Sequence, residues 1–220
     1  MVTLISLIRQ GNIQQAVIFI LSGCFVVFIC SPIHELSHAF VAYKLGDNTA
    51  KKEGRLTFNP ISHIDPIGMI MILLFGFGYA KPVPVDMRNF KNPKSGMALT
   101  ALAGPVSNII MAFISIFIVY AMGEPSSAFL GYVKTFFEFS AIINVSLGAF
   151  NLIPIPPLDG SKILAGILPN KTYYKYMQYE RYAMIGLLVL LATGVLDKIL
   201  NVAVTALLFV ISIIPHLIFS

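Results

Sequence analysis

The chain carries little charge. Of its 220 residues only 11% are Asp, Glu, Lys or Arg, whereas 57% are hydrophobic and the mean hydropathy is +0.82. Soluble domains contain about 25% charged residues, so this composition excludes a soluble globular protein. Lipid forces backbone groups to pair within their own segment, which favours helices. We therefore predict an all-α polytopic membrane protein, with residues 1–220 forming a single membrane domain.

Cysteine is scarce and a targeting signal is absent. Cys24 and Cys30 lie six positions apart in one apolar run, so they do not share a helix face and cannot reach disulfide geometry. The N-terminus has neither an early basic region nor an A-x-A-like site, so we expect no cleavable signal peptide. The net charge of +5 fits cytoplasmic loops rather than nucleic-acid binding, because Lys and Arg cluster between apolar segments.

Long apolar runs, in contrast, are plentiful. They predict about five transmembrane helices, at about residues 13–45, 96–122, 128–153, 182–194 and 196–219. The apolar segment 66–78 is shorter than the roughly 20 residues that a span needs, which predicts a re-entrant, membrane-embedded segment. Alternate prolines in 79–86 predict an extended piece or an edge strand. We expect a catalytic core at about 13–168 and accessory helices at about 171–219.

The distribution of basic residues predicts an orientation. Eight of the fifteen Lys and Arg residues lie between Lys44 and Lys94, four lie in residues 162–181, and none lies in the loop 123–127. The positive-inside rule places the first two regions in the cytoplasm. The first span then ends, and the span 96–122 begins, on the same side, so the segment between them must enter and leave by one face. We expect an integral protein of the plasma membrane with its site toward the cytoplasm.

One apolar segment contains a polar motif, HELSH, at residues 34–38. On a helix, His34 and His38 are four positions apart and share a face, so they can bind one Zn²⁺. Glu35 beside them can act as general base on a metal-bound water. The alternative is two histidines satisfied by ordinary hydrogen bonds. A charged residue at the centre of a membrane helix costs about 2.5–3.5 kcal/mol, so three clustered ionisable groups favour a shared metal.

Two histidines do not complete a catalytic zinc site, which has three protein ligands and a water. Asp159 follows a helix that three prolines break, where irregular backbone at membrane depth would line a cavity. It could instead cap the next helix, and its spacing does not decide between ligand and cap. His63 and Asp65 could form a local turn, and His216 suits the interface. The candidates for the third ligand are His63, Asp65, Asp86, Asp159 and His216.

Two motifs together resemble the site-2 protease family of intramembrane zinc metalloproteases. The first is HELSH on the first long helix, and the second is FNLIPIPPLDG at 150–160, which matches the family pattern F-N-x-x-P-x-x-P-x-D-G. The similarity extends over about residues 16–165, and the last two helices carry little of it. Further matching stretches are GRLTFNPISHIDPIG (54–68), GYAKPVPVD (78–86) and LAGPVSN (102–108).

The resemblance implies that His34, His38 and Asp159 hold one Zn²⁺ per chain and that Glu35 activates water. It also implies that Asn151 lines the site, where its amide could hold the substrate or stabilise an oxyanion. The alternative for Asn151 is capping of a helix end. The chain resembles the short form of the family, without a PDZ-like insertion or a nucleotide-binding domain of the cystathionine-synthase type.

Other polar and small residues within the spans have simpler interpretations. Asn108 and Asn144 predict hydrogen bonds between helices. Gly104 and Pro105 predict close packing or a kink. His63 is a weaker candidate for a place in the site.

The favoured function is a zinc endopeptidase that cleaves transmembrane or membrane-proximal segments of other proteins. Its partners would be those substrates and the lipid bilayer, with no nucleic acid; the oligomeric state stays open. A divalent-metal transporter is the first alternative, but it would not need Glu35 beside the first histidine, and no inverted repeat is visible. A non-catalytic binder of membrane proteins is the second, and the intact HELSH and LDG motifs argue against it.

Overall fold

A computed structural model describes residues 4–75, 80–169, 172, 176, 178 and 180–219, and within these residues it contains helices and loops but no strand. This confirms the predicted all-α class. The shorter elements that precede the second span are α1 (Leu4–Arg9), α4 (Thr49–Lys52), α5 (Pro66–Phe75), and the 3-10 turns η2 (Pro60–Ser62) and η3 (Met87–Asn89).

Four helices of the described chain are long and apolar enough to cross a membrane. They are the continuous helix Ile13–Lys44, α6 (Pro93–Ala121), α7 (Ala128–Asn151) and α11 (Val195–Phe219). The fifth predicted span is α10 (Glu180–Ala192), which has 13 residues. At 1.5 Å per residue it is about 20 Å long, less than the roughly 30 Å of a hydrocarbon core. Among the described residues, four helices are therefore candidate spans, against the expected five; α10 is described from Glu180 on, since residue 179 lies outside the described residues.

The first span changes its helical pitch just before the HELSH motif. It consists of α2 (Ile13–Phe25), a π-helical turn η1 (Val26–Cys30) and α3 (Ser31–Lys44), and the Ser31 N–H donates to the carbonyl of Val26, five residues back. Pro32 explains the change, because proline has no N–H and its ring clashes with the carbonyl four residues before it. A π-turn widens the helix locally and relieves that clash.

The segment that was predicted to re-enter the membrane is α5, ten residues long. Such a helix extends about 15 Å and does not cross a bilayer, so membrane re-entry stays a prediction. The predicted segment runs to residue 78, and residues 76–79 lie outside the described residues. After this gap the chain forms what we call the strap, residues 80–86, which has no regular secondary structure. The expected edge strand is therefore not formed in the described part of 79–86.

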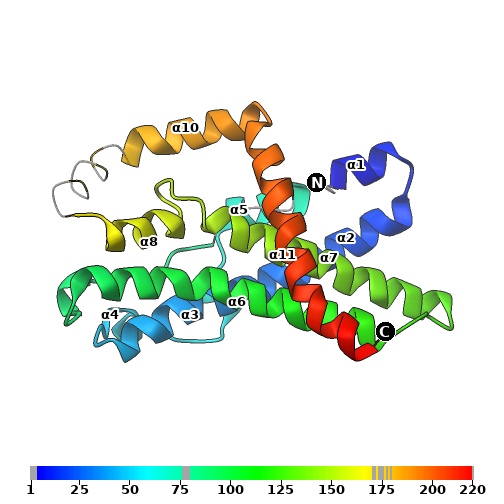
Figure 1. Cartoon of the computed structure of the whole chain (residues 1–220), viewed down its shortest axis with the longest axis horizontal. Coiled ribbons are helices and arrows are strands. Elements are labelled where there is room, and N and C mark those ends of the chain that lie inside the picture. Colours follow the sequence, from blue (N-terminus) through cyan, green and yellow to red (C-terminus); the bar gives the residue numbers. More distant parts are fainter. Residues whose placement is uncertain are drawn as a thin grey trace.

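Helix α6 occupies the middle of the fold. It packs against α3, α7, α11 and the short helix α8 (Asp159–Ile167), and Figure 1 shows α3 and α8 on either side of it. Small residues permit this approach, since a Cβ atom added at Gly166 would lie 2.5 Å from the Cβ of Ala98. Two clusters of buried apolar side chains surround α7, one shared with α2 and the other with α11.

Two sequence predictions about buried polar and thiol groups can be checked in the first cluster. Asn144 in α7 donates to the Sγ of Cys30 at 3.4 Å and to the carbonyl of Ser140 at 2.9 Å, which confirms its interhelical hydrogen bond. Cys24 and Cys30 are free thiols, as their spacing predicts.

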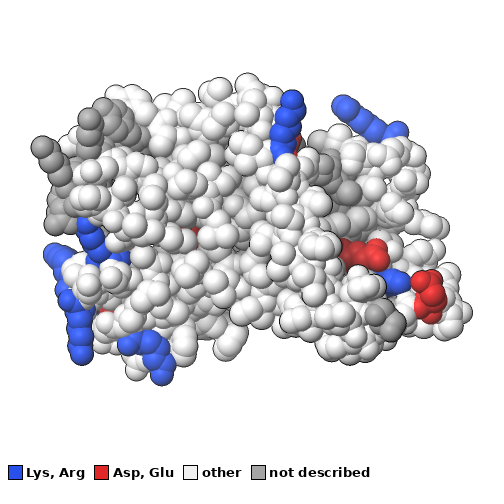
Figure 2. Space-filling view, viewed as in Figure 1, with Lys and Arg blue, Asp and Glu red and all other residues white. Residues whose placement is uncertain are grey.

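The charged residues on the face shown in Figure 2 avoid its broad middle. Lys and Arg side chains gather at the end where α4 and the beginning of α6 lie, and the centre of this face is almost free of charge. An uncharged band between polar ends is what a lipid bilayer requires of a protein that spans it. The surface therefore agrees with the composition in defining a polytopic membrane protein.

Candidate metal centre

The two histidines of HELSH face each other in the middle of the molecule. His34 and His38 are one turn apart on α3, both are buried, and their Nε2 atoms are 3.1 Å apart. A carboxylate oxygen of Glu35 belongs to the same cluster, in which all ligand atoms lie within 4.8 Å of one another. Among the described residues, this is where His, Cys, Asp or Glu side chains gather closely enough to hold a metal.

Each histidine uses its other ring nitrogen to bind helix α6. The Nδ1 of His34 lies 2.5 Å from the Oδ1 of Asn108, and the Nδ1 of His38 lies 2.7 Å from the carbonyl oxygen of Thr100. Both partners are acceptors, so each Nδ1 carries the proton. The neutral rings then direct Nε2 lone pairs toward each other, which is the tautomer that metal-binding histidines adopt.

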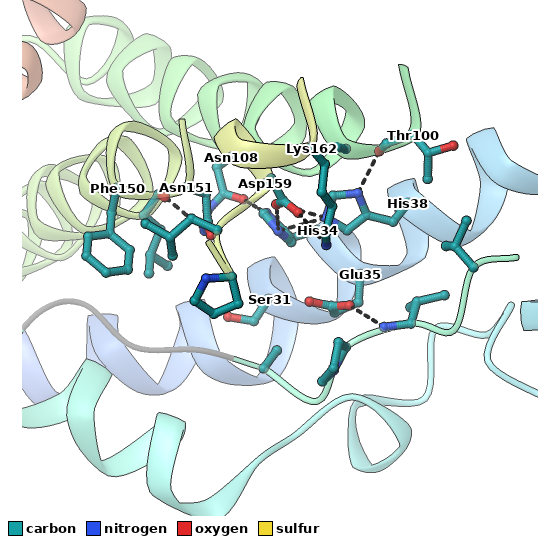
Figure 3. A pocket seen from close by; sticks show the side chains of 18 of the residues that line it. Ser31, His34, Glu35, His38, Thr100, Asn108, Phe150, Asn151, Asp159 and Lys162 are labelled. Carbon is teal, nitrogen blue, oxygen red and sulfur yellow. Dashed lines mark hydrogen bonds and ion pairs between the residues drawn. The ribbon is translucent and has the colours of Figure 1, made fainter. Parts of the chain in front are cut away.

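Asp159 completes the cluster from another part of the chain. Its Oδ2 lies 3.4 Å from the Nε2 of His34 and 3.2 Å from the Nε2 of His38, as Figure 3 shows. Asp159 is the first residue of α8, and the N-cap position is Leu158, which makes no side-chain capping bond. The capping interpretation of Asp159 is therefore wrong, and the carboxylate faces the histidines instead.

The glycine after Asp159 explains how α8 reaches this position. A Cβ atom added at Gly160 would overlap the carbonyl oxygens of Leu152 and Ile153, directly after the end of α7. Only glycine permits so close an approach between the start of α8 and the chain leaving α7. The LDG sequence thus folds Asp159 back toward α3.

The other candidate ligands lie elsewhere and have other partners. The ring Nε2 of His63 is 2.9 Å from the carbonyl of Thr57, and Asp65 accepts the N–H groups of Ile67 and Gly68 at the start of α5. Asp86 pairs with Arg88 at 2.7 Å, and the ring of His216 in α11 packs edge-to-face against Tyr120. The local turn expected at His63 and Asp65 is confirmed.

Asn151 and Asn108 are both hydrogen-bonded, and of the two it is Asn108 that contacts a histidine of the HELSH motif. Asn151 borders the cavity of the site, but its Nδ2 donates to the carbonyl of Leu147 at 3.0 Å, which is the helix-end bond that was its alternative. Asn108 makes the predicted interhelical bond, and its partner is a candidate ligand, His34. The only signal in the sequence was a polar residue inside the apolar span 96–122.

The cluster opens into a cavity of about 750 Å³, lined mainly by apolar side chains. Glu35 lies at its wall opposite Asp159, and its Oε2 accepts the backbone N–H of Val83 in the strap at 3.0 Å (Figure 3). The Nζ of Lys162 lies 3.4 Å from the Oδ1 of Asp159. A polar cluster at the wall of an apolar cavity is typical of an active site.

This donor set fits a zinc ion. Two imidazole nitrogens and one carboxylate oxygen are the three protein ligands of many catalytic zinc sites. Two Nε2 lone pairs held 3.1 Å apart beside a carboxylate repel each other unless a cation lies between them. Space for that cation exists because Gly104 of α6 has no side chain: an added Cβ would overlap the Nε2 atoms of both histidines.

The fold and the site together define a polytopic helical membrane protein with a buried centre of two histidines and one carboxylate. Residues 121–195 match the model of peptidase family M50, a stretch that includes Asp159 but not HELSH. The similarity to a curated relative extends further, over 165 residues at 48% identity. The chain belongs to peptidase family M50, the site-2 protease family.

The relatives come from bacteria and archaea. The 48% identical relative, "Putative zinc metalloprotease YwhC" of Bacillus subtilis, aligns over 73% of this chain and 75% of its own length. "Putative zinc metalloprotease Rip2" of Mycolicibacterium smegmatis is 26% identical over 87% of this chain and 73% of its own length. "Putative zinc metalloprotease MJ0611" of Methanocaldococcus jannaschii is 36% identical over 60% of this chain and 62% of its own length. No solved structure is significantly similar to the chain.

Replacing Asn108 by Leu should weaken zinc binding about 10- to 100-fold, because the ring of His34 loses the acceptor that fixes its tautomer. Competition with a chromogenic chelator measures the affinity. Asn144→Leu is the matched control, since Asn144 is also a buried amide within a span but bonds to Cys30 and Ser140. Equal effects of the two substitutions on zinc affinity would contradict a specific role of Asn108.

Replacing Gly104 by Ala should abolish zinc binding, because the added Cβ would overlap the Nε2 atoms of both histidines and displace their rings. Alanine is better than glycine in a helix interior by about 1 kcal/mol, while its methyl group would occupy the space between the histidines. Zinc content and thermal unfolding are the two measurements. Gly131→Ala is the control, because the nearest atom to a Cβ added there is 4.0 Å away. A Gly104→Ala protein with full zinc content would contradict the assigned position of the metal.

Proposed function

We propose that this protein is a zinc-dependent endopeptidase that cleaves membrane-embedded or membrane-proximal segments of other proteins. The observation that carries the proposal is the approach of Asp159 to His34 and His38, which lie 125 and 121 positions before it in the sequence. His34, His38 and Asp159 would hold the ion, and Glu35 would be the general base. Membership in peptidase family M50 and the names of the relatives, zinc metalloproteases, support this chemistry.

His34, His38 and Asp159 would hold a zinc ion whose Lewis acidity would polarise the scissile carbonyl and make a water more acidic. Glu35 takes a proton from the water as the oxygen attacks the carbonyl carbon. The same carboxyl group then delivers the proton to the nitrogen of the leaving amine as the peptide C–N bond breaks. Asn108 and the Thr100 carbonyl keep both imidazoles oriented throughout, because they hold the Nδ1 protons.

The substrate would have to unwind before cleavage, because a helix hides its peptide groups in hydrogen bonds. The cavity of about 750 Å³ has an apolar lining that suits a few residues of an unwound membrane segment. We propose that Asn151 contacts this segment. Its bond to Leu147 uses one of its two N–H groups, which leaves the second N–H and the Oδ1 for a substrate peptide.

We further propose that the protein resides in the plasma membrane with its site toward the cytoplasm. The basic end of the molecule in Figure 2 supports this orientation, because cytoplasmic loops carry an excess of Lys and Arg. The strap contains Lys81 of the basic stretch 44–94, and its Val83 N–H contacts Glu35. Water would therefore reach the site from the cytoplasmic side.

The test uses purified protein in lipid nanodiscs with a quenched fluorescent peptide that contains a membrane-spanning sequence. Glu35→Gln should retain zinc, because Glu35 is not a ligand, and should lower kcat by about 10²- to 10⁴-fold, the usual contribution of a general base. Wild-type cleavage by this variant would remove Glu35 from the mechanism.

A transporter would behave differently in the same particles. It would move zinc across sealed vesicles, and neither wild type nor variant would cleave the peptide. Chelation of zinc should stop cleavage, and restoring zinc should recover it. Cleavage that continues at full rate without bound zinc would contradict the proposed function.

A further inference from the structure

The strap, residues 80–86, contacts Glu35 through its backbone. The N–H of Val83 donates to the Oε2 of Glu35 at 3.0 Å. Val83 lies between Pro82 and Pro84, neither of which has an N–H, so residues 82–84 offer a single backbone donor. Each proline fixes its own φ and restricts the residue before it to extended conformations. The PVP sequence therefore presents one stiff donor to the carboxylate.

The beginning of the strap is held by a buried arginine. The guanidinium of Arg55 donates through one nitrogen to the carbonyl of Lys81 at 2.7 Å and to that of Pro82 at 3.3 Å. Only 9% of Arg55 is exposed. A second bond supports the same end, since the N–H of Lys81 donates to the carbonyl of His63 at 2.8 Å. Arginine is seldom buried without such partners, so this contact is a built feature.

The end of the strap is held by a buried aspartate. Asp47 has no exposed surface, and its carboxylate accepts the N–H of Asp86 at 2.8 Å and the Nδ2 of Asn89 at 2.8 Å. Burial raises the pKa of Asp47, but hydrogen bonds from Thr49, Asn89 and the Asp86 N–H together lower it by more. The pKa of Asp47 is therefore below its usual range. The carboxylate that holds this end is therefore charged.

Both anchors lie between α3 and α5, Asp47 before α4 and Arg55 after it. Asp47 comes three residues after the end of α3, and its N–H donates to the carbonyl of Ala42 in that helix at 2.9 Å. The end of the strap is thus tied to α3 through Asp47, its beginning is held by Arg55, and it touches Glu35 of α3 in between. Because the Val83 bond uses one carboxylate oxygen, it sets the rotation of the carboxylate and leaves the other oxygen to receive a proton.

We propose that the strap orients Glu35 and that Arg55 and Asp47 are positioning residues for this general base. This proposal rests on the proposed function of Glu35 as general base. The hydrogen bonds that hold the strap in place do not depend on that function. A general base must be held in hydrogen-bond reach of the water, and a misplacement of about 1 Å can cost about 10²-fold in rate.

The experiment compares Arg55→Met, Arg55→Lys and the control Arg88→Met in nanodiscs. Arg88 lies two residues after the strap and pairs with Asp86, but its side chain is 89% exposed, and exposed pairs contribute little. Arg55→Met should lower kcat by about 10- to 100-fold with unchanged zinc content and a small change in KM. Arg55→Lys keeps the charge and should recover part of the loss, and Arg88→Met should behave as wild type.

A second measurement does not depend on catalysis. Hydrogen–deuterium exchange of peptides that cover residues 80–86 should be faster in Arg55→Met and in Glu35→Ala than in wild type, and unchanged in Arg88→Met. Unchanged exchange in Arg55→Met would overturn the fixing of the strap. Faster exchange with a normal kcat per bound zinc would overturn the positioning role, and so would a loss of zinc or of thermal stability in proportion to the loss of kcat.

Asp47→Asn provides the same test if Arg55→Met does not fold. It removes the charge at the other anchor while keeping the shape of the side chain, and it should also raise exchange over residues 80–86 and lower kcat. If wild type itself cleaves no peptide, the proposed function fails. The exchange experiment then still decides whether the strap is fixed to Glu35.

Discussion

The site depends on one contact, that of the Asp159 carboxylate with the imidazoles of His34 and His38. It joins α8 to α3, and α6 lies between them with a partner for each ring nitrogen that faces away from the site. Gly104 leaves space for an ion at this junction, and Gly160 lets the chain turn tightly enough to bring Asp159 there. The two histidines and Asp159 come together only where α3 and α8 meet.

The low polarity of a membrane interior explains why this site is so fully bonded. A buried polar group without a partner is costly, and more so where no water can replace the partner. Here each ionisable residue of the HELSH motif has a partner outside α3: His34 on α6 through a side chain, His38 on α6 through a carbonyl, and Glu35 on the strap through an N–H. Orientation of the catalytic groups and satisfaction of their hydrogen bonds are therefore the same requirement.

The sequence predicts the parts of this structure that have a side-chain signature. The HELSH motif predicts a cluster of metal-binding type, which the structure forms from His34, Glu35 and His38. Long apolar runs predict about five spans, of which four appear in the described residues. It does not separate a ligand from a cap at Asp159, because an aspartate before Gly-Ser suits either role until α3 is placed beside it. It does not distinguish Asn108 from Asn144, because both are amides in apolar spans and only the packing of α6 selects the partner of each. The Val83 contact is made by the backbone N–H, so the identity of the residue does not predict it, and only the two flanking prolines point to it.

X-ray absorption at the zinc K-edge of the purified protein tests the central claim most directly, with wild type compared with Asp159→Ala. Wild type should show two imidazole ligands and oxygen ligands at about 2.0–2.2 Å, one of them from the carboxylate. Asp159→Ala should lose that carboxylate and bind zinc more weakly, while keeping the two imidazoles. An unchanged spectrum and unchanged affinity in Asp159→Ala would contradict the account, because the third ligand would then lie elsewhere.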